Sequence, residues 1–267
     1  MEELEGRVAV ITGGASGIGR AVARRLAREA MRLVLADRDP DGLAEAKREL
    51  DKDGADVLTV PTDVGDLEQV RELADRTFDH FGAAHVVFNN AGVAAAGRVW
   101  ELAHEDWEWM LRVNLWGVIH GVEVFVPRLL EQGQPAHVIS TASFAGLVPN
   151  FGLGAYCVSK YGVVALMECL ARELRGTEIG VSVLCPMMVS TRIGEHSSRD
   201  RPSTSEPLPE TLEPSGRPPE GRVLEPEAVA EQVVSAIRRR DLYILTHAEA
   251  REPIRRRFER IDRAFSD

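Results

Sequence analysis

The chain has 267 residues, of which 44% are hydrophobic and 28% charged, enough to bury the core of one large domain covering residues 1–267. The formal net charge of -10 argues against a nucleic-acid partner, because phosphate binding requires a basic face. The opening MEELEGRVAV lacks the basic start of a secretory signal, and no apolar run approaches the roughly 18 residues that span a bilayer. We therefore expect a soluble, cytoplasmic protein without a membrane partner.

Short apolar strands alternate with amphipathic helices over most of the chain. The run RVAVIT at 7–12 predicts a first buried strand, and a helix follows at 17–30. Further strands are expected at 33–37, 57–61, 85–89, 136–141 and 181–186, and further helices at 41–51, 66–81, 105–130 and 156–174. Because these strands lack polar alternation, they are predicted to be buried on both faces, in a doubly wound, mostly seven-stranded parallel sheet of the Rossmann type.

The sequence changes character after Thr191. Residues 195–222 contain six prolines and almost no large apolar side chain, which predicts either a disordered loop or a lid that orders over a ligand. A helix at 226–240 and a last strand at 243–247 follow. Residues 249–267 carry Ile254, Phe258, Ile261 and Phe265 at helical spacing. We expect this tail helix to pack on the body or on a neighbouring subunit.

A glycine-rich turn, TGGASGIG, joins the first strand to the first helix. Gly13, Gly17 and Gly19 would let the backbone approach a pyrophosphate at the helix N-terminus, although any strand-to-helix turn can use glycine. Asp37 ends the second strand, where a ribose-binding acid belongs. A carboxylate there favours NAD over NADP, whereas the adjacent Arg38 could pair with a 2′-phosphate and leaves NADP open.

Tyr156 and Lys160 stand four residues apart on a predicted helix. That interval places them on one face, where the ammonium could lower the pKa of the phenol, or could have no functional meaning. Other chemistry is less well supported. Cys157, Cys169 and Cys185 form no CxxC pair and are expected to be reduced, and the seven histidines have no ligand spacing, so no metal site is expected.

With the glycine turn and the YxxxK pair together, the chain resembles the short-chain dehydrogenase/reductase family, over residues 4–191 and the last strand. Asp63 in TDV, the NNAG segment from Asn89 to Gly92, Asn114 in VNLWG and Ser143 in ISTASFAG fall in the family's order. The resemblance implies a catalytic set of Asn114, Ser143, Tyr156 and Lys160. It implies coenzyme contacts at Gly13, Ser16, Gly17, Ile18, Gly19, Asp37, Arg38, Asp63, Val64, Asn90, Ala91, Gly92, Tyr156, Lys160, Pro186, Val189 and Thr191.

The implied reaction is hydride transfer between a secondary alcohol and a ketone, with Tyr156 as general base or acid. A free tyrosine has a pKa of about 10, so the base requires help, which Lys160 and the oxidised nicotinamide would supply. By the resemblance, Ser143 hydrogen-bonds the substrate oxygen and Lys160 also binds the nicotinamide ribose. Asn114 holds a water that links Lys160 to bulk solvent.

One departure from the family's pattern is CPMMVST, in which Met187 replaces the usual glycine after the sixth strand. Met187 and Met188 would suit a bulky apolar substrate. Other apolar residues could extend that wall or simply pack in the core: Phe144, Leu147, Phe151 and residues 93–96. Three tryptophans on the long helix are expected to be buried against the sheet or a subunit face: Trp107, Trp109 and Trp116.

We therefore expect an NAD-dependent oxidoreductase acting on a medium to large apolar alcohol or ketone, such as a terpenoid, steroid or polyketide-like molecule. The alternatives are an NADPH-dependent carbonyl reductase and a non-catalytic nucleotide-binding or regulatory protein. The family's habit also implies a homodimer or homotetramer, built through the long helix and the Tyr156 helix.

Overall fold

A computed structural model describes residues 1, 3–202 and 222–265. In these residues seven strands form one parallel sheet in the order β3-β2-β1-β4-β5-β6-β7. This confirms the predicted fold class. The strands are β1 (Val8–Thr12), β2 (Arg32–Asp37), β3 (Val57–Pro61), β4 (Val86–Asn89), β5 (Ala136–Thr141), β6 (Ile179–Cys185) and β7 (Tyr243–Leu245).

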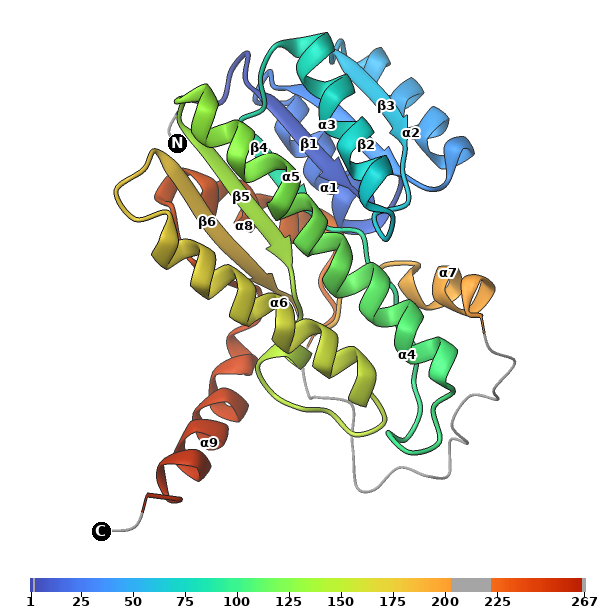
Figure 1. Cartoon of the computed structure of the whole chain (residues 1–267), viewed down its shortest axis with the longest axis vertical. Coiled ribbons are helices and arrows are strands. Elements are labelled where there is room, and N and C mark those ends of the chain that lie inside the picture. The colour runs from blue at the N-terminus through green and yellow to red at the C-terminus, as the bar shows by residue number, and fades with distance from the viewer. Residues whose placement is uncertain (2, 203–221, 266–267) are drawn as a thin grey trace.

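Helices cover both faces of the sheet (Figure 1). Helices α1 and α8 pack on each other over one face, together with α2, and helices α3, α5 and α6 cover the other face. The helices are α1 (Gly17–Ala27), α2 (Pro40–Lys52), α3 (Leu67–Phe81), α4 (His104–Leu111), α5 (Gly117–Gln132), α6 (Gly154–Glu173), α7 (Ile193–Asp200), α8 (Pro226–Arg239) and α9 (Arg251–Asp262).

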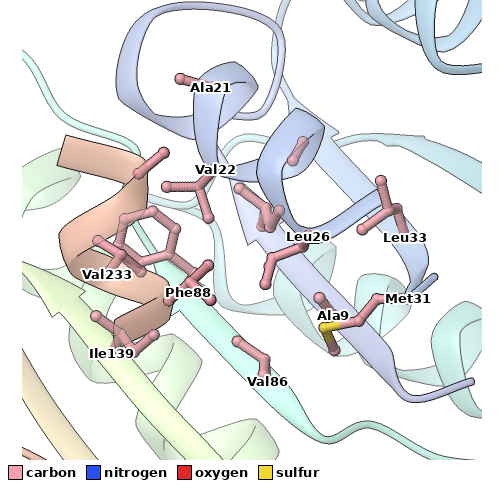
Figure 2. Close-up of a cluster of buried hydrophobic side chains, with 14 of the residues drawn as sticks. Ala9, Ala21, Val22, Leu26, Met31, Leu33, Val86, Phe88, Ile139 and Val233 are labelled. Carbon is pink, nitrogen blue, oxygen red and sulfur yellow. The ribbon is translucent and has the colours of Figure 1, made fainter. Parts of the chain in front are cut away.

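The period of two in the strands divides the core into two layers. Ala9 and Leu33 point towards α1 and α8, where they meet Leu26 and Val233 (Figure 2). Val8 and Val34 point to the opposite face and join the cluster formed by α3, α5 and α6. Both layers are apolar, which is why these strands read as continuous hydrophobic runs in the sequence.

The strand order opens a crevice for a ligand. The chain passes from β1 outward to β2 and β3, then returns across β1 to form β4 on its other side. The loops that follow β1 and β4 therefore diverge at the carboxyl ends of these strands, where open α/β sheets bind ligands. Thr12 ends β1 and Asn89 ends β4, so both glycine-rich and asparagine-rich segments meet at this edge.

The long helix predicted at 105–130 is interrupted. A five-residue π-helix, η1 (Arg112–Trp116), separates α4 from α5 and contains Asn114. Such π-turns cost regular hydrogen bonding and are frequent at functional sites. Of the three tryptophans, Trp109 is buried and Trp107 partly buried, as expected, but Trp116 is 53% exposed and packs on the ring of His120.

The stretch His104–Gln132 is also long and apolar enough to cross a membrane by length and composition, with a mean hydropathy of 1.2. We expected no such segment, because no apolar run in the sequence approaches the roughly 18 residues that span a bilayer. In the fold 56% of the apolar 18-residue window within this stretch is buried, as in a core helix that covers a sheet.

Two segments near the C-terminus differ from the prediction. Residues 195–200, expected to belong to a loop at 195–222, form most of α7, and residues 203–221 lie outside the described part of the chain. Helix α9 forms as predicted, but it projects from the body (Figure 1). None of its residues is buried, and Phe258, Ile261 and Phe265 remain exposed, so this stripe does not pack on the body.

Candidate active site

A cleft of about 470 Å³ lies at the carboxyl ends of the strands. It collects side chains from the loops after β1, β2, β3, β4, β5 and β6 and from helices α6 and α7. All the residues predicted to bind the coenzyme line it except Gly19, and so do Ser143, Tyr156 and Lys160 of the predicted catalytic set. The topology therefore brings together residues that are far apart in the sequence.

The glycine turn fits a bound pyrophosphate. Gly13 and Gly17 have φ angles of 65° and 52°, which favour glycine, and both line the cleft at the start of α1. Gly19 has a different role, because a Cβ there would lie 2.2 Å from the carbonyl oxygen of Gly13. It allows the helix to pack against the turn rather than facing the ligand.

Asp37 closes one end of the cleft at the tip of β2. Its carboxylate accepts hydrogen bonds of 3.1 Å from the backbone N–H groups of Ala15 and Asp39. Burial raises the pKa of this carboxyl, and those two hydrogen bonds oppose the rise. The carboxylate is thus fixed in direction beside the glycine turn, where it can accept from ribose hydroxyls.

The middle of the cleft is held by hydrogen bonds between the loops after β1, β4 and β5. The hydroxyl of Thr12 accepts from the backbone N–H groups of Asn90 and Ala91 at 2.9 and 3.1 Å. The amide of Asn90 donates to the carbonyl of Thr12 and accepts from the hydroxyl of Thr141. Neither threonine was predicted, because threonine at a strand end has no distinctive spacing.

Asn89 and Asn90 have different surroundings, although both belong to the NNAG motif. Asn89 is buried and donates to Ser140, and a Cβ on Gly121 would lie 2.1 Å from its Oδ1 atom. Asn89 therefore joins β4 to α5, whereas Asn90 faces the cleft. On the loop after β3, the carboxylate of Asp63 accepts hydrogen bonds from the guanidinium of Arg112 at 2.8 Å and from the N–H of Gly65 at 2.9 Å.

Tyr156 and Lys160 lie on the first turns of α6, as the spacing predicts. The ammonium of Lys160 is buried, donates to the carbonyl of Thr141 at 2.8 Å, and lies 5.6 Å from the centroid of the Tyr156 ring. The side chain of Ser143 lies near enough to the Tyr156 phenol to lower its pKa. It also accepts from the N–H of Ala145 at 3.1 Å, which fixes its position at the end of β5.

Asn114 does not line the cleft but stands directly behind it. Its side chain accepts from the N–H of Val93 at 2.8 Å and donates to the carbonyl of Val93 at 2.9 Å. It also donates to the hydroxyl of Ser159 on α6 at 3.2 Å. The π-helix aims this amide at the loop after β4, so that Asn114 holds that loop against the Lys160 helix.

The electrostatics of the pair differ from the expectation in one respect. We expected the phenol pKa to be lowered by Lys160, but in the free protein burial raises the pKa of Tyr156, and the neighbouring Ser143 side chain opposes this rise. Burial also lowers the pKa of Lys160, to about 8. Sequence spacing predicts which groups are neighbours, but it does not predict how strongly burial desolvates them, and that desolvation sets the direction of both pKa shifts.

The apolar wall is smaller than expected. Met187, Met188 and Val93 line the cleft, and Ile193 of α7 adds to them. The other candidates do not: Phe144, Leu147, Phe151 and residues 94–96. Phe144 is a core residue at 4% exposure, and Phe151 is exposed on the outer surface. These positions were chosen for being apolar and close in sequence to predicted site residues, which does not show whether a side chain faces the cleft.

Helix α7 supplies a set of polar cleft residues that the sequence did not suggest: Arg192, His196, Arg199 and Asp200. The prolines that follow obscured its helical character, although Ile193 and Ser197 have the spacing of one helical face. Among the described residues no group of three or more His, Cys, Asp or Glu side chains is arranged to hold a metal.

Comparisons with known proteins identify the family of this chain. The family model for short chain dehydrogenases matches residues 7–202. Over 190 residues the chain is 45% identical to 1-deoxy-11-beta-hydroxypentalenate dehydrogenase of Streptomyces exfoliatus, covering 70% of this chain and 69% of that protein. It is 30% identical over 272 residues to the CLA biosynthesis dehydrogenase/reductase of Lactiplantibacillus plantarum, covering 98% and 95% of the two chains.

Among solved structures, a short chain dehydrogenase/reductase from Burkholderia phymatum in complex with NAD matches with a TM-score of 0.90 and 41% identity, covering 100% of this chain and 98% of that one. The chain therefore belongs to the short-chain dehydrogenase family, as the sequence motifs predicted. It is an oxidoreductase that acts on a CH–OH group and binds a nicotinamide coenzyme, NAD or NADP.

Proposed function

We propose that this protein is an NAD-dependent dehydrogenase that interconverts a secondary alcohol and a ketone on a medium to large apolar molecule. The observation that carries this proposal is that Ser143, Tyr156 and Lys160 line the same cleft as Asp37. Ser143 follows β5 and Asp37 ends β2, and β1 and β4 lie between these two strands, so the two groups stand at opposite ends of the cleft. One end then suits proton and hydride chemistry, and the other suits an adenosine ribose with two free hydroxyls.

In the proposed reaction an oxidised nicotinamide held in the cleft would supply the acceptor for the hydride of the carbinol carbon. Ser143 holds the substrate oxygen by a hydrogen bond, and the phenolate of Tyr156 removes its proton. Lys160 stabilises that phenolate and binds the ribose next to the nicotinamide. We assign Asn114 the holding of a water through which the proton leaves Lys160, because its amide lies between Val93 and the Lys160 helix.

The proposed residues for coenzyme binding follow the cleft from end to end. The glycine turn receives the pyrophosphate, and Asp37 receives the adenosine ribose. Asp63 and Val64 border the adenine, and Asn90, Ala91 and Gly92 line the floor. Pro186, Val189 and Thr191 would hold the nicotinamide carboxamide. All of these side chains or backbone segments line the cleft.

Two observations bear on the substrate. Met187, Met188 and Ile193 give the nicotinamide end an apolar wall. The Streptomyces exfoliatus relative is named as a dehydrogenase of 1-deoxy-11-beta-hydroxypentalenate, a hydroxyl-bearing molecule. We therefore place terpenoid, steroid and polyketide-like alcohols first among substrates. We also propose that the protein is cytoplasmic and assembles as a homodimer or homotetramer.

The second candidate function is an NADPH-dependent carbonyl reductase. It is favoured by Arg38, whose side chain is 42% exposed and lines the cleft beside Asp37. An arginine at this position could bind a 2′-phosphate. The two candidates differ in coenzyme and in direction, not in the residues that move the proton.

A single assay series separates these candidates. Purified protein is incubated with NAD or NADP and a panel of alcohols, from small polyols to polycyclic alcohols, while nicotinamide reduction is followed by absorbance. We expect turnover with NAD and bulky apolar alcohols, and weaker NAD binding in Asp37→Ala. A preference for small polar polyols would remove the substrate proposal, and a preference for NADP that survives Asp37→Ala would favour the reductase.

A further inference from the structure

Helix α7 brings an acidic residue to the coenzyme-selecting end of the cleft. We propose that Asp200 acts together with Asp37 to select NAD over NADP, because it holds Arg38 in an ion pair and adds a carboxylate where a 2′-phosphate would lie. This inference deepens the proposed function and rests on its assignment of the adenosine ribose to the Asp37 end of the cleft.

The contact joins two distant parts of the chain. Arg38 directly follows β2, and its guanidinium forms an ion pair with the carboxylate of Asp200 at the end of α7. Both residues line the same cleft as Asp37 and Asp39. The side chain of Asp200 is only 16% exposed, so water competes less for this pair than for a typical surface ion pair.

A second arginine fixes the direction of the Asp200 carboxylate. Arg199 donates to both of its oxygens, at 2.9 and 3.1 Å. These hydrogen bonds and the charge of Arg38 lower the pKa of Asp200, so the group is an anion at neutral pH. Arg38 is therefore paired with a carboxylate anion at neutral pH and not with a protonated, neutral carboxyl group.

Helix α7 is anchored on both sides of the pair, so Asp200 is not free to swing away. Near its middle, the buried hydroxyl of Ser197 accepts from the N–H of Ala94 at 2.9 Å. Just beyond its end, Arg201 donates to the fully buried carboxylate of Asp106 on α4 at 3.0 Å and 2.5 Å. Figure 1 shows α7 beside α4 in the resulting position.

This arrangement penalises NADP specifically. A 2′-phosphate carries about two negative charges and would need Arg38 as its counter-ion, but Arg38 is already paired with Asp200. Breaking that pair would leave Asp200 beside the phosphate, together with Asp37 and Asp39. Arg199 remains nearby but is occupied by Asp200. NAD has a 2′-hydroxyl at this point, and Asp37 can accept a hydrogen bond from it without disturbing the ion pair between Arg38 and Asp200.

The experiment measures coenzyme binding directly, without turnover. NADH and NADPH are titrated into the full-length wild type, Asp200→Asn, Arg38→Gln and the double variant, and dissociation constants are read from nicotinamide fluorescence. We expect Asp200→Asn to lower the Kd for NADPH by about tenfold and to change the Kd for NADH less than twofold. In the Arg38→Gln background the same substitution should change the NADPH Kd by less than about threefold, because Arg38 is absent and only Arg199, whose side chain is 62% exposed, is released.

The matched control is Glu195→Gln, which removes a carboxylate from the exposed face of α7 without touching Arg38. It should leave both dissociation constants unchanged. Circular dichroism of each variant verifies that the fold is retained.

The outcomes distinguish this inference from the proposed function. An unchanged NADPH Kd in Asp200→Asn overturns the inference, and so does an equal change for NADH and NADPH, which would mean that Asp200 only supports α7. If the wild type binds NADPH more tightly than NADH, the proposed NAD preference fails. The comparison between Asp200→Asn and the double variant still tests the role of Asp200 in that case.

Discussion

The ammonium of Lys160 lies 5.6 Å from the ring of Tyr156 while it donates to the end of β5, at the carbonyl of Thr141. The lysine is therefore positioned by two elements, α6 through its backbone and β5 through its hydrogen bond. Because Ser143 follows the same strand, one strand end sets the relative positions of all three groups. The sequence spacing alone fixes only the lysine and the tyrosine.

The first prediction concerns the energetic cost of burying Lys160. Its pKa falls from 10.5 to about 8, so the charged form is disfavoured in the fold, at a cost of about 3 kcal/mol at pH 7. Between pH 8 and 10.5 the unfolded chain binds more protons at this site than the folded protein, so wild-type stability rises with pH relative to a variant without the lysine. Lys160→Met should be more stable than the wild type at pH 7, and this advantage should disappear by pH 10.5.

Chemical denaturation at several pH values measures this difference. Lys52→Met, at an exposed position at the end of α2, is the control for loss of a lysine. A wild type that exceeds Lys160→Met in stability by a constant amount from pH 7 to 10.5 would contradict the prediction.

A second prediction concerns His137, a buried residue on β5. Its ring hydrogen-bonds to the hydroxyl of Ser182 on β6 at 2.8 Å, and burial lowers its pKa from 6.5 to about 3. Between those values the unfolded chain binds more protons, so stability falls as the pH falls from 6.5 towards 3. His137→Gln lacks this titration. Its deficit relative to the wild type at pH 7 should shrink by about 1.4 kcal/mol per pH unit below 6.

The measurement is the free energy of unfolding of both proteins in urea at pH 7, 6, 5 and 4. His85 also has a lowered pKa but is present in both proteins, so its contribution cancels in the comparison. Parallel pH profiles for the two proteins would refute a role for His137 in acid sensitivity.

A third prediction tests the packing of the glycine turn. In Gly19→Ala the new methyl would lie 2.2 Å from the carbonyl oxygen of Gly13, so the turn must shift. We expect a loss of about 1–3 kcal/mol in stability and weaker NADH binding, as measured by denaturation and fluorescence titration. Gly194→Ala in α7 is the matched control, since its Cβ would meet no atom within 4 Å. It should be neutral or slightly stabilising; equal effects of the two substitutions would argue against the steric account.

A fourth prediction concerns the pH dependence of the two reaction directions. Since burial raises the pKa of Tyr156, only a small fraction of the phenol is ionised at neutral pH before the coenzyme binds. Alcohol oxidation should therefore accelerate with rising pH, and ketone reduction, which needs the protonated phenol, should slow at high pH. Initial rates in both directions from pH 6 to 10 measure this. The same pH trend in both directions would be inconsistent with one group serving as base and acid.

Much of the fold could be predicted because it depends on local patterns, and most of the cleft because motifs such as NNAG resemble those of a known family. Apolar runs such as residues 8–12 are strands because both faces of the sheet are covered, and the topology then carries Asp37, Asn90 and Tyr156 to the same edge. The glycine turn and the YxxxK spacing are also local. These features need no information about distant contacts.

The remaining features depend on tertiary contacts between distant residues. The pairing of Arg38 with Asp200 requires that α7 lie across the cleft, and the position of α7 depends on Ala94 and Asp106. Similarly, the π-helix around Asn114 forms where its amide satisfies the backbone of Val93. The apolar stripe of α9 predicts a helix but not which surface covers it: the body leaves Phe258 and Ile261 exposed, and packing on a neighbouring subunit stays a prediction.

The measurement that tests the central claim most directly compares the wild type with Tyr156→Phe in a single turnover with NAD and an alcohol substrate found in the panel. The substitution removes only the phenolic oxygen, so NADH binding measured by fluorescence should stay within a few-fold of the wild type. The hydride-transfer rate should fall by about 10²–10⁴-fold. A variant that binds NADH normally and still transfers hydride within threefold of the wild-type rate would contradict the role assigned to Tyr156.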